Sequence, residues 1–225
     1  MTRQLILDLP PDPRLTRADF CVAPSNLLAL AAIDAWRAWP TRKMLLIGPQ
    51  GAGKSHLAQI WAVDAGAVLL SAAVLATADI AALGTHGAVA VEDAEMLAGN
   101  AGAEANLFHL HNLLAPSGTL LVTARSTPRD WGLALADLTS RMQATPLTRL
   151  DPPDDALLSA VLAKLFSDRQ LAISANLVPY LVARMDRSIA AARILVATLD
   201  ARSLSQHRPI TRALAGEILE SQTNE

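Results

Sequence analysis

The sequence has 225 residues, of which 52% are hydrophobic and 18% are charged, so it is long enough for an α/β core and a small second domain. Its formal net charge is −2 and its basic residues form no stripe, which disfavours a protein that grips duplex DNA by itself. The single cysteine, Cys21, excludes an internal disulfide framework. Ser71, Thr77 and Asp79 interrupt the longest alanine- and leucine-rich stretch, so we expect no membrane span. Because a single cysteine fits a reducing cytosol and prolines and acids stand where a secretory signal needs an apolar run, we expect a cytoplasmic protein.

The chain begins with a segment that is not expected to be helical. Residues 1–13 combine a short apolar motif with prolines that keep the backbone extended. Ser25 then predicts a helix N-cap, and the helix is expected to run from about Asn26 to Trp39 and to end before Pro40.

Short apolar runs separated by helical segments follow, at Lys43–Ile47, Ala67–Ser71, Ala88–Glu92, Thr119–Thr123 and Ala144–Leu147. Continuous apolar runs that alternate with helices indicate a parallel sheet covered on both faces. The predicted fold class is therefore α/β, a five-stranded parallel sheet with flanking helices followed by a small α-helical domain.

The Asp151-Pro152-Pro153-Asp154 stretch predicts the domain boundary, because it breaks regular structure and then caps a new helix. We expect an N-terminal peptide and spacer at 1–13, an α/β domain at 14–150 and a helical domain at 151–225. The helices predicted after the boundary are Asp155–Arg169, Ser174–Met185, Ser188–Ser203 and Thr211–Glu220.

Residues Gly48–Ser55 fit the phosphate-binding pattern G-x-x-x-x-G-K-S, directly after an apolar run and at the start of a helix. Its glycines let several backbone N–H groups face one oxyanion, with a helix N-terminus behind them. Lys54 is expected to bridge the β- and γ-phosphates, and Ser55 to join a Mg²⁺ shell. The pattern predicts ATP or ADP as ligand, with contacts from Gly48, Gln50, Gly51, Ala52, Gly53, Lys54, Ser55 and His56.

A P-loop also needs carboxylates at the end of a neighbouring strand. The apolar run that starts at Ala88 ends in Glu92 and Asp93. We expect Glu92 to act on Mg²⁺ together with Ser55, and Asp93 to orient the attacking water. The alternative, a strand that simply ends in solvated acids, is common.

These motifs resemble the DnaA initiator family of AAA+ proteins, and within it the DnaA-related regulators of the Hda type, over nearly the whole chain. Residues 20–26, Phe-Cys-Val-Ala-Pro-Ser-Asn, look like the family's F-V-x-G-x-S-N segment beside the adenine. Residues 97–99 and 108–112 look like the helix after the strand acids; His109 and His111 there are interpreted as structural. The resemblance implies an AAA+ P-loop NTPase module with a lid, and nucleotide contacts from Phe20, Cys21, Val22 and Asn26.

Local matches to the family imply roles for residues that the pattern alone does not single out. Thr123 ends the fourth strand, where the family keeps its sensor 1 residue. Arg141 lies in Leu-Thr-Ser-Arg, which resembles the box with the arginine finger, and Arg193 lies on a lid helix like the sensor 2 segment. Arg193 would contact the phosphates bound by its own chain, whereas Arg141 would reach a nucleotide held by a neighbour.

The chain departs from the family at two places. The initiators carry two aspartates where this chain has Glu92-Asp93, so we expect weak hydrolysis by the protein alone. The initiators also continue after the lid into a DNA-binding domain, whereas this sequence stops at Glu225, so we expect no direct sequence-specific DNA binding.

The peptide Gln4–Leu9, Gln-Leu-Ile-Leu-Asp-Leu, resembles the Q-L-x-L-x-L motif that binds the sliding clamp of DNA polymerase. Gln4 would occupy a polar pocket, and leucines would fill an apolar groove. A short strand packed on its own domain would have the same pattern. The predicted clamp contacts are Gln4, Leu5, Leu7 and Leu9.

The leading hypothesis is a nucleotide-bound adaptor that docks on the clamp and presents Arg141 to ATP-bound DnaA, whose ATP hydrolysis prevents over-initiation. One alternative is a self-sufficient AAA+ ATPase that loads or remodels a replication factor with Glu92 and Asp93. Another is a paralogue that binds nucleotide for stability only. A small-molecule kinase is disfavoured, because no acceptor site is evident, and assembly of homo-oligomers is left open.

Overall fold

The structure, a computed structural model, describes residues 15–115 and 117–223. The chain forms two compact units, which are described separately here. The first unit contains the described residues up to Phe20, then Leu28–Pro49 and Gly53–Leu150. The second unit contains Cys21–Leu27, Gln50–Ala52 and the described residues from Asp151 onward.

The first unit is built on a five-stranded parallel sheet in the order β2-β3-β4-β1-β5. Its strands are β1 (Lys43–Ile47), β2 (Val68–Ser71), β3 (Ala88–Glu92), β4 (Thr119–Ala124) and β5 (Leu147–Arg149). The central strands β1 and β4 are buried along their whole length, as expected for continuous apolar runs in a sheet covered on both faces. The predicted parallel sheet is therefore confirmed.

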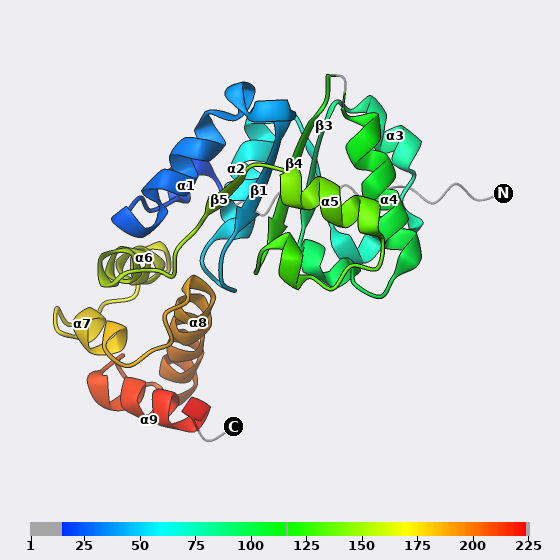
Figure 1. The fold of residues 1–225 in the computed structure, drawn as a ribbon. Coiled ribbons are helices and arrows are strands. Elements are labelled where there is room, and N and C mark those ends of the chain that lie inside the picture. The colour runs from blue at the N-terminus through cyan, green and yellow to red at the C-terminus, as the bar shows by residue number, and fades with distance from the viewer. Residues whose placement is uncertain (1–14, 116, 224–225) are drawn as a thin grey trace. The chain divides into compact units, whose positions relative to one another are not determined.

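Helices cover both faces of the sheet (Figure 1). The part of α1 (Pro24–Asp34) that belongs to this unit and α2 (Lys54–Ala65) lie on one face. Helices α3 (Ile80–Thr85), α4 (Ala101–Leu113) and α5 (Ala136–Ala144) lie on the other. Leu45, Val91 and Val122 of the sheet share one buried cluster with Leu110 of α4 and Met142 of α5. This cluster fixes α4 and α5 against the strands whose ends carry the predicted acids.

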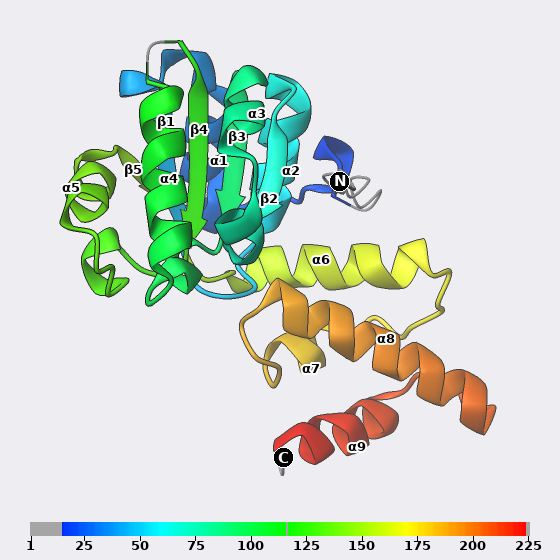
Figure 2. The same cartoon turned by 90° about the vertical axis from the view of Figure 1, so that its right-hand side faces the viewer.

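The second unit is a helical bundle around its own core. Its helices are α6 (Asp155–Asp168), α7 (Leu177–Val182), α8 (Ile189–Gln206) and α9 (Arg212–Thr223). Helix α8 packs against both α6 and α9 (Figure 2). Leu162, Phe166, Leu181 and Leu199 lie in the middle of this core. Among the described residues, no helix is long and apolar enough to cross a membrane.

Within residues 15–115 and 117–223, six short 3-10 helices connect the main elements, at Arg17–Asp19, Trp36–Ala38, Pro40–Arg42, Ala72–Thr77, Ala94–Leu97 and Pro128–Asp130. They are labelled η1 to η6 in chain order. The predicted helix to Trp39 is thus too long, because regular α-helix ends at Asp34 and two 3-10 turns follow.

The predicted cap at Ser25 is wrong. Helix α1 begins at Pro24, which suits the first helical position because it has no N–H to satisfy. Within the second unit, the Asp154 carboxylate accepts the Ser25 N–H at 3.2 Å and the Leu157 N–H at 2.7 Å. Asp154 therefore caps α6, as predicted, and also binds the start of α1.

The last strand also differs from its prediction, Ala144–Leu147. Ala144 ends α5, whose last turn is closed by Thr145 Oγ1 donating to the Arg141 carbonyl at 2.9 Å. Pro146 follows and cannot donate to a strand ladder, so pairing with β1 starts at Leu147. In the second unit, the helix predicted at Ser174–Met185 begins only at Leu177, after a turn closed by the Ser174 carbonyl.

Candidate functional site: the P-loop edge of the sheet

The P-loop starts where β1 ends and is fixed to the neighbouring strand. The Gly48 N–H donates to the Ala124 carbonyl at the end of β4, at 3.1 Å. A Cβ atom on Gly48 would overlap the Leu150 carbonyl oxygen, so the backbone passes too close to the chain for any side chain. Gly51 and Gly53 have φ angles of +73° and +111°, which L-residues rarely adopt. The glycine positions of the pattern therefore each have a local structural reason.

Lys54 is the first residue of α2, and its side chain turns back over the loop. Its Nζ donates to the carbonyl oxygens of Gly48 at 2.8 Å and Pro49 at 3.0 Å. Burial lowers the pKa of Lys54, while the carboxylates of Asp93 and Glu95 raise it and the guanidinium of Arg125 lowers it. The ammonium group thus lies in the field of the acids that follow β3 and needs an anionic ligand more than a surface lysine does.

Glu92 is the last residue of β3 and is half-buried at this edge. Burial raises its pKa, whereas a hydrogen bond with Ser55 lowers it. Its Oε1 is buried and accepts no hydrogen bond from the part of the chain that the structure describes. An unsatisfied carboxylate oxygen beside a serine hydroxyl fits a divalent cation, because hard cations prefer oxygen ligands. The donor set therefore suits Mg²⁺, although the described residues contain no group of three or more His, Cys, Asp or Glu that could hold a metal alone.

Asp93 and Thr123 are joined across the strand ends. Asp93 has a φ of +56°, an uncommon left-handed conformation for a residue with a side chain. Its N–H donates to Thr123 Oγ1 at 3.2 Å, and Thr123 is fully buried at the end of β4. Such backbone strain is often found at functional sites. The structure thus brings Lys54, Ser55, Glu92, Asp93 and Thr123 together at one edge of the sheet.

The residues predicted to line the adenine fall into both units. In the first, the rings of Phe20 and His56 meet edge to face with centroids 5.1 Å apart, and a ring nitrogen of His56 lies 2.8 Å from the Thr16 carbonyl oxygen. In the second, the Asn26 amide donates to the Cys21 carbonyl at 2.8 Å, and its Oδ1 accepts the Ala23 N–H at 2.9 Å.

Both the oxygen and the nitrogen of the Asn26 side-chain amide therefore form hydrogen bonds with the backbone of the turn that precedes it, which supports a structural role. Val22 is 57% exposed, and Cys21 is half-buried. Gln50, Gly51 and Ala52 belong to the second unit, where the Gly51 carbonyl accepts the Ile189 N–H at 2.8 Å. Arg193 lies half-buried on α8 of the same unit.

Arg141 does not belong to the P-loop edge. It lies exposed in the last turn of α5. Its positive charge lowers the pKa of Lys43, the first residue of β1, and of His111 on α4, in each case after the larger effect of burial. Since the P-loop follows the opposite, carboxyl end of β1, Arg141 and Lys54 are placed at different ends of that strand.

Two further charged residues at the P-loop edge were not predicted. Glu95 lies in η5, two residues after Asp93, and Arg125 follows Thr123 by two residues at the end of β4. Arg125 Nε lies 3.2 Å from Glu95 Oε1, and the Arg125 N–H donates to Oε2 at 3.3 Å. The available signal was their position just after strands that already carried candidates. The clamp-binding contacts Gln4, Leu5, Leu7 and Leu9 lie outside the described residues.

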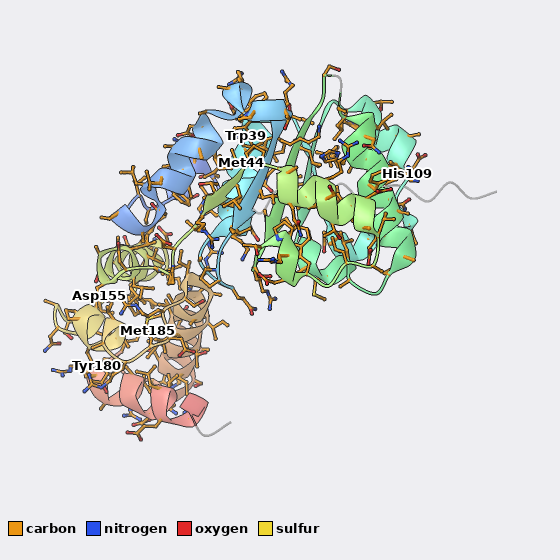
Figure 3. All side chains as sticks on the ribbon, viewed as in Figure 1. Trp39, Met44, His109, Asp155, Tyr180 and Met185 are labelled. Atoms are coloured by element: carbon orange, nitrogen blue, oxygen red, sulfur yellow. The ribbon has the colours of Figure 1, made fainter. Side chains whose placement is uncertain are left out.

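The histidines of α4 differ from each other. His109 is exposed on the outer side of the helix, away from the sheet (Figure 3). His111 is buried, and its Nδ1 has no hydrogen-bond partner among the described residues.

Comparison with known proteins shows which sequences this chain resembles. No family model matches the sequence. The chain is 27% identical to the chromosomal replication initiator protein DnaA of Thermomicrobium roseum, over 97% of its own length and 53% of that protein. It therefore spans about half the length of this curated relative.

Solved structures agree on the fold. Domain III of the Thermotoga maritima replication initiation protein DnaA superimposes with a TM-score of 0.79 at 19% identity, covering 94% of this chain and 98% of that one. AMPPCP-bound DnaA from Aquifex aeolicus gives a TM-score of 0.72 at 17% identity, covering 87% of this chain and 68% of that one. The predicted AAA+ P-loop NTPase fold with a helical C-terminal part is thereby confirmed, and the chain is similar in sequence to DnaA and in fold to domain III of DnaA.

Proposed function

We propose that this protein is a nucleotide-bound adaptor that docks on the sliding clamp and stimulates ATP hydrolysis by DnaA. The observation that carries the proposal is the position of Arg141, exposed on α5 at the other end of β1 from its own P-loop. A guanidinium in that position is available to a nucleotide held by another protein. The homology to DnaA supports DnaA as that protein.

Nucleotide binding rests on the chain's own P-loop. The glycine turns, the Lys54 ammonium and the start of α2 supply donors for a polyphosphate. Ser55 and Glu92 would hold Mg²⁺, which would neutralise charge on the phosphates. The AMPPCP bound to the similar DnaA of Aquifex aeolicus supports an adenine nucleotide as the ligand. We propose ADP or ATP with Mg²⁺ for the resident site.

The role proposed for Arg141 is electrostatic. Phosphoryl transfer to water spreads negative charge over the transferred group, and a guanidinium supplied by a partner can accelerate it by roughly 10³- to 10⁵-fold. The Arg141 side chain is exposed, so it can reach into a neighbouring protein's site without rearrangement of its own core. The Gln4–Leu9 peptide would hold the adaptor on the DNA-loaded clamp.

The test is ATP hydrolysis by DnaA in the presence of DNA-loaded clamp. The protein is added as wild type, Arg141→Ala, or with both Gln4 and Leu7 changed to alanine. We expect wild type to accelerate hydrolysis and both variants to fail. The matched control is Arg149→Ala, an exposed arginine on β5 of the same unit, which should act like wild type. Equal stimulation by wild type and Arg141→Ala would refute the proposed role.

The second candidate is a self-sufficient ATPase. It is favoured by the hydrogen bond from Asp93 to Thr123 and by the half-buried Glu92 beside Ser55, because these groups would serve hydrolysis in the protein's own site. Turnover by the isolated protein, abolished by Glu92→Gln and with no effect on DnaA, would establish this candidate in place of the adaptor.

A further inference from the structure

Arg125 is the cation at the P-loop edge that no sequence motif explains. It follows β4 directly, and the last residue of that strand, Ala124, accepts the N–H of Gly48 at 3.1 Å. The backbone of Arg125 is therefore fixed beside the first residue of the P-loop. Its charge is within electrostatic reach of Lys54, whose pKa it lowers.

One carboxylate holds Arg125 in this position. Glu95 accepts the Arg125 backbone N–H at 3.3 Å and lies 3.2 Å from its Nε. The contact with Nε is at ion-pair distance, but Glu95 Oε1 accepts no aligned hydrogen bond although it is buried. The Arg125 side chain is 49% exposed, whereas that of Glu95 is 16% exposed. The pair therefore has a fixed acid and a guanidinium that faces solvent.

The pair of Glu95 and Arg125 lies at the strand ends where the terminal phosphate of a bound nucleotide is expected. Of the groups suited to metal and water, Glu92 is the last residue of β3 and Asp93 follows it, and Thr123 is the penultimate residue of β4. In phosphoryl transfer these groups act on the terminal phosphate, so that phosphate must lie above the ends of these two strands. Arg125 extends from the same strand end, and planar guanidinium groups bind phosphate oxygens with two parallel hydrogen bonds.

We infer that Arg125 distinguishes a nucleoside triphosphate from a diphosphate by exchanging Glu95 for the terminal phosphate. This inference rests on the proposed nucleotide binding. It states that the ion pair of Arg125 and Glu95 determines whether the site prefers a nucleotide with two or with three phosphates. The exchange gives up a contact at ion-pair distance in which Glu95 Oε1 accepts no aligned hydrogen bond, and the phosphate offers the half-exposed guanidinium aligned acceptors in its place. With a diphosphate, the guanidinium stays on Glu95.

The experiment is isothermal titration calorimetry with Mg²⁺-AMPPCP and Mg²⁺-ADP, supported by melting temperatures of the unliganded proteins. Arg125→Ala should weaken AMPPCP binding about tenfold and ADP binding less than about twofold. Glu95→Gln should leave AMPPCP binding as tight as in wild type or tighter, because the competing charge is gone. Arg129→Ala, an exposed arginine in η6 on the same connection, should bind both ligands like wild type.

The outcomes separate this inference from the proposal on which it rests. If wild type binds neither ligand, nucleotide binding itself fails and the inference with it. If wild type binds both but Arg125→Ala changes neither affinity, or weakens both by the same factor, the inference alone is overturned. If Arg125→Ala melts far below wild type, Arg125→Lys serves in its place. Lysine keeps the positive charge but cannot form the bidentate hydrogen bonds of arginine, so Arg125→Lys should still lose AMPPCP affinity selectively.

Discussion

The pH dependence of folding tests the environment of His111, a buried histidine on α4. The residue is 7% exposed, and its Nδ1 has no hydrogen-bond partner. Burial, followed by the positive charge of Lys43 on β1, lowers the pKa of His111 from 6.5 to about 4, although Asn112 partly opposes the shift. Arg141 on α5 acts in the same direction as Lys43. The folded protein therefore keeps this imidazole neutral.

In the unfolded chain His111 takes up a proton near its ordinary pKa of about 6.5. The folded state resists protonation until the pH approaches about 4. Protonation of His111 thus favours the unfolded chain. The stability that the neutral His111 contributes is fully present above about pH 6.5 and is lost progressively as the pH falls towards 4. Between about pH 7.5 and about pH 5, this histidine alone should lower the free energy of unfolding by about 2 kcal/mol.

Urea unfolding at both pH values measures this difference in wild type, His111→Gln and His109→Gln. Glutamine does not titrate, so His111→Gln should lose about 2 kcal/mol less than wild type over the interval, whatever its stability at neutral pH. His109 is exposed on the same helix, and its glutamine variant should follow wild type (Figure 3). Equal losses in wild type and His111→Gln would refute the reasoning.

Three further predictions concern the P-loop and the helix cap. Gly48→Ala should unfold at least about 1–3 kcal/mol more easily in urea, because its Cβ would overlap the Leu150 carbonyl. Lys54→Ala should lose measurable Mg²⁺-ADP binding in calorimetry while its melting temperature stays near that of wild type, because the lysine's hydrogen bonds go only to loop carbonyls. Asp154→Ala should cost about 1–2 kcal/mol in thermal unfolding, since both the Leu157 and Ser25 N–H groups lose their acceptor.

Much of the fold could be predicted because its strands are buried on both faces. In a run such as Lys43–Ile47 every residue is buried, so the ends of the apolar run are also the ends of the strand. The predicted bounds of this run are those of β1. The edge strand β5 was misplaced because only three residues pair, and Leu147 at its start is 43% exposed. Apolar pattern carries little information at such an edge, where the position of Pro146 decides the register.

In the candidate site, too, features made by neighbouring residues could be predicted, whereas contacts between residues far apart in the sequence could not. The P-loop could be predicted because its glycines and Lys54 are contiguous, and each answers a local geometric need. The ion pair of Glu95 and Arg125 joins residues 30 positions apart and only forms once β3 and β4 are paired. The cap at Ser25 failed for a similar reason, because the acceptor that serves its N–H comes from Asp154, 129 positions later.

The structure also changes the roles that the end of β4 can play. The resemblance to the DnaA family made Thr123 the candidate sensor 1 residue, and in the structure its buried Oγ1 accepts the N–H of Asp93 at 3.2 Å. A hydroxyl used as an acceptor still has one proton to donate, so Thr123 can join Asp93 to a second group. Its first effect, however, is to hold Asp93 in the left-handed conformation that turns the chain after β3. Because a buried hydroxyl fixed in this way has little reach, the longer and half-exposed Arg125 is the better placed of the two to follow the length of a bound polyphosphate.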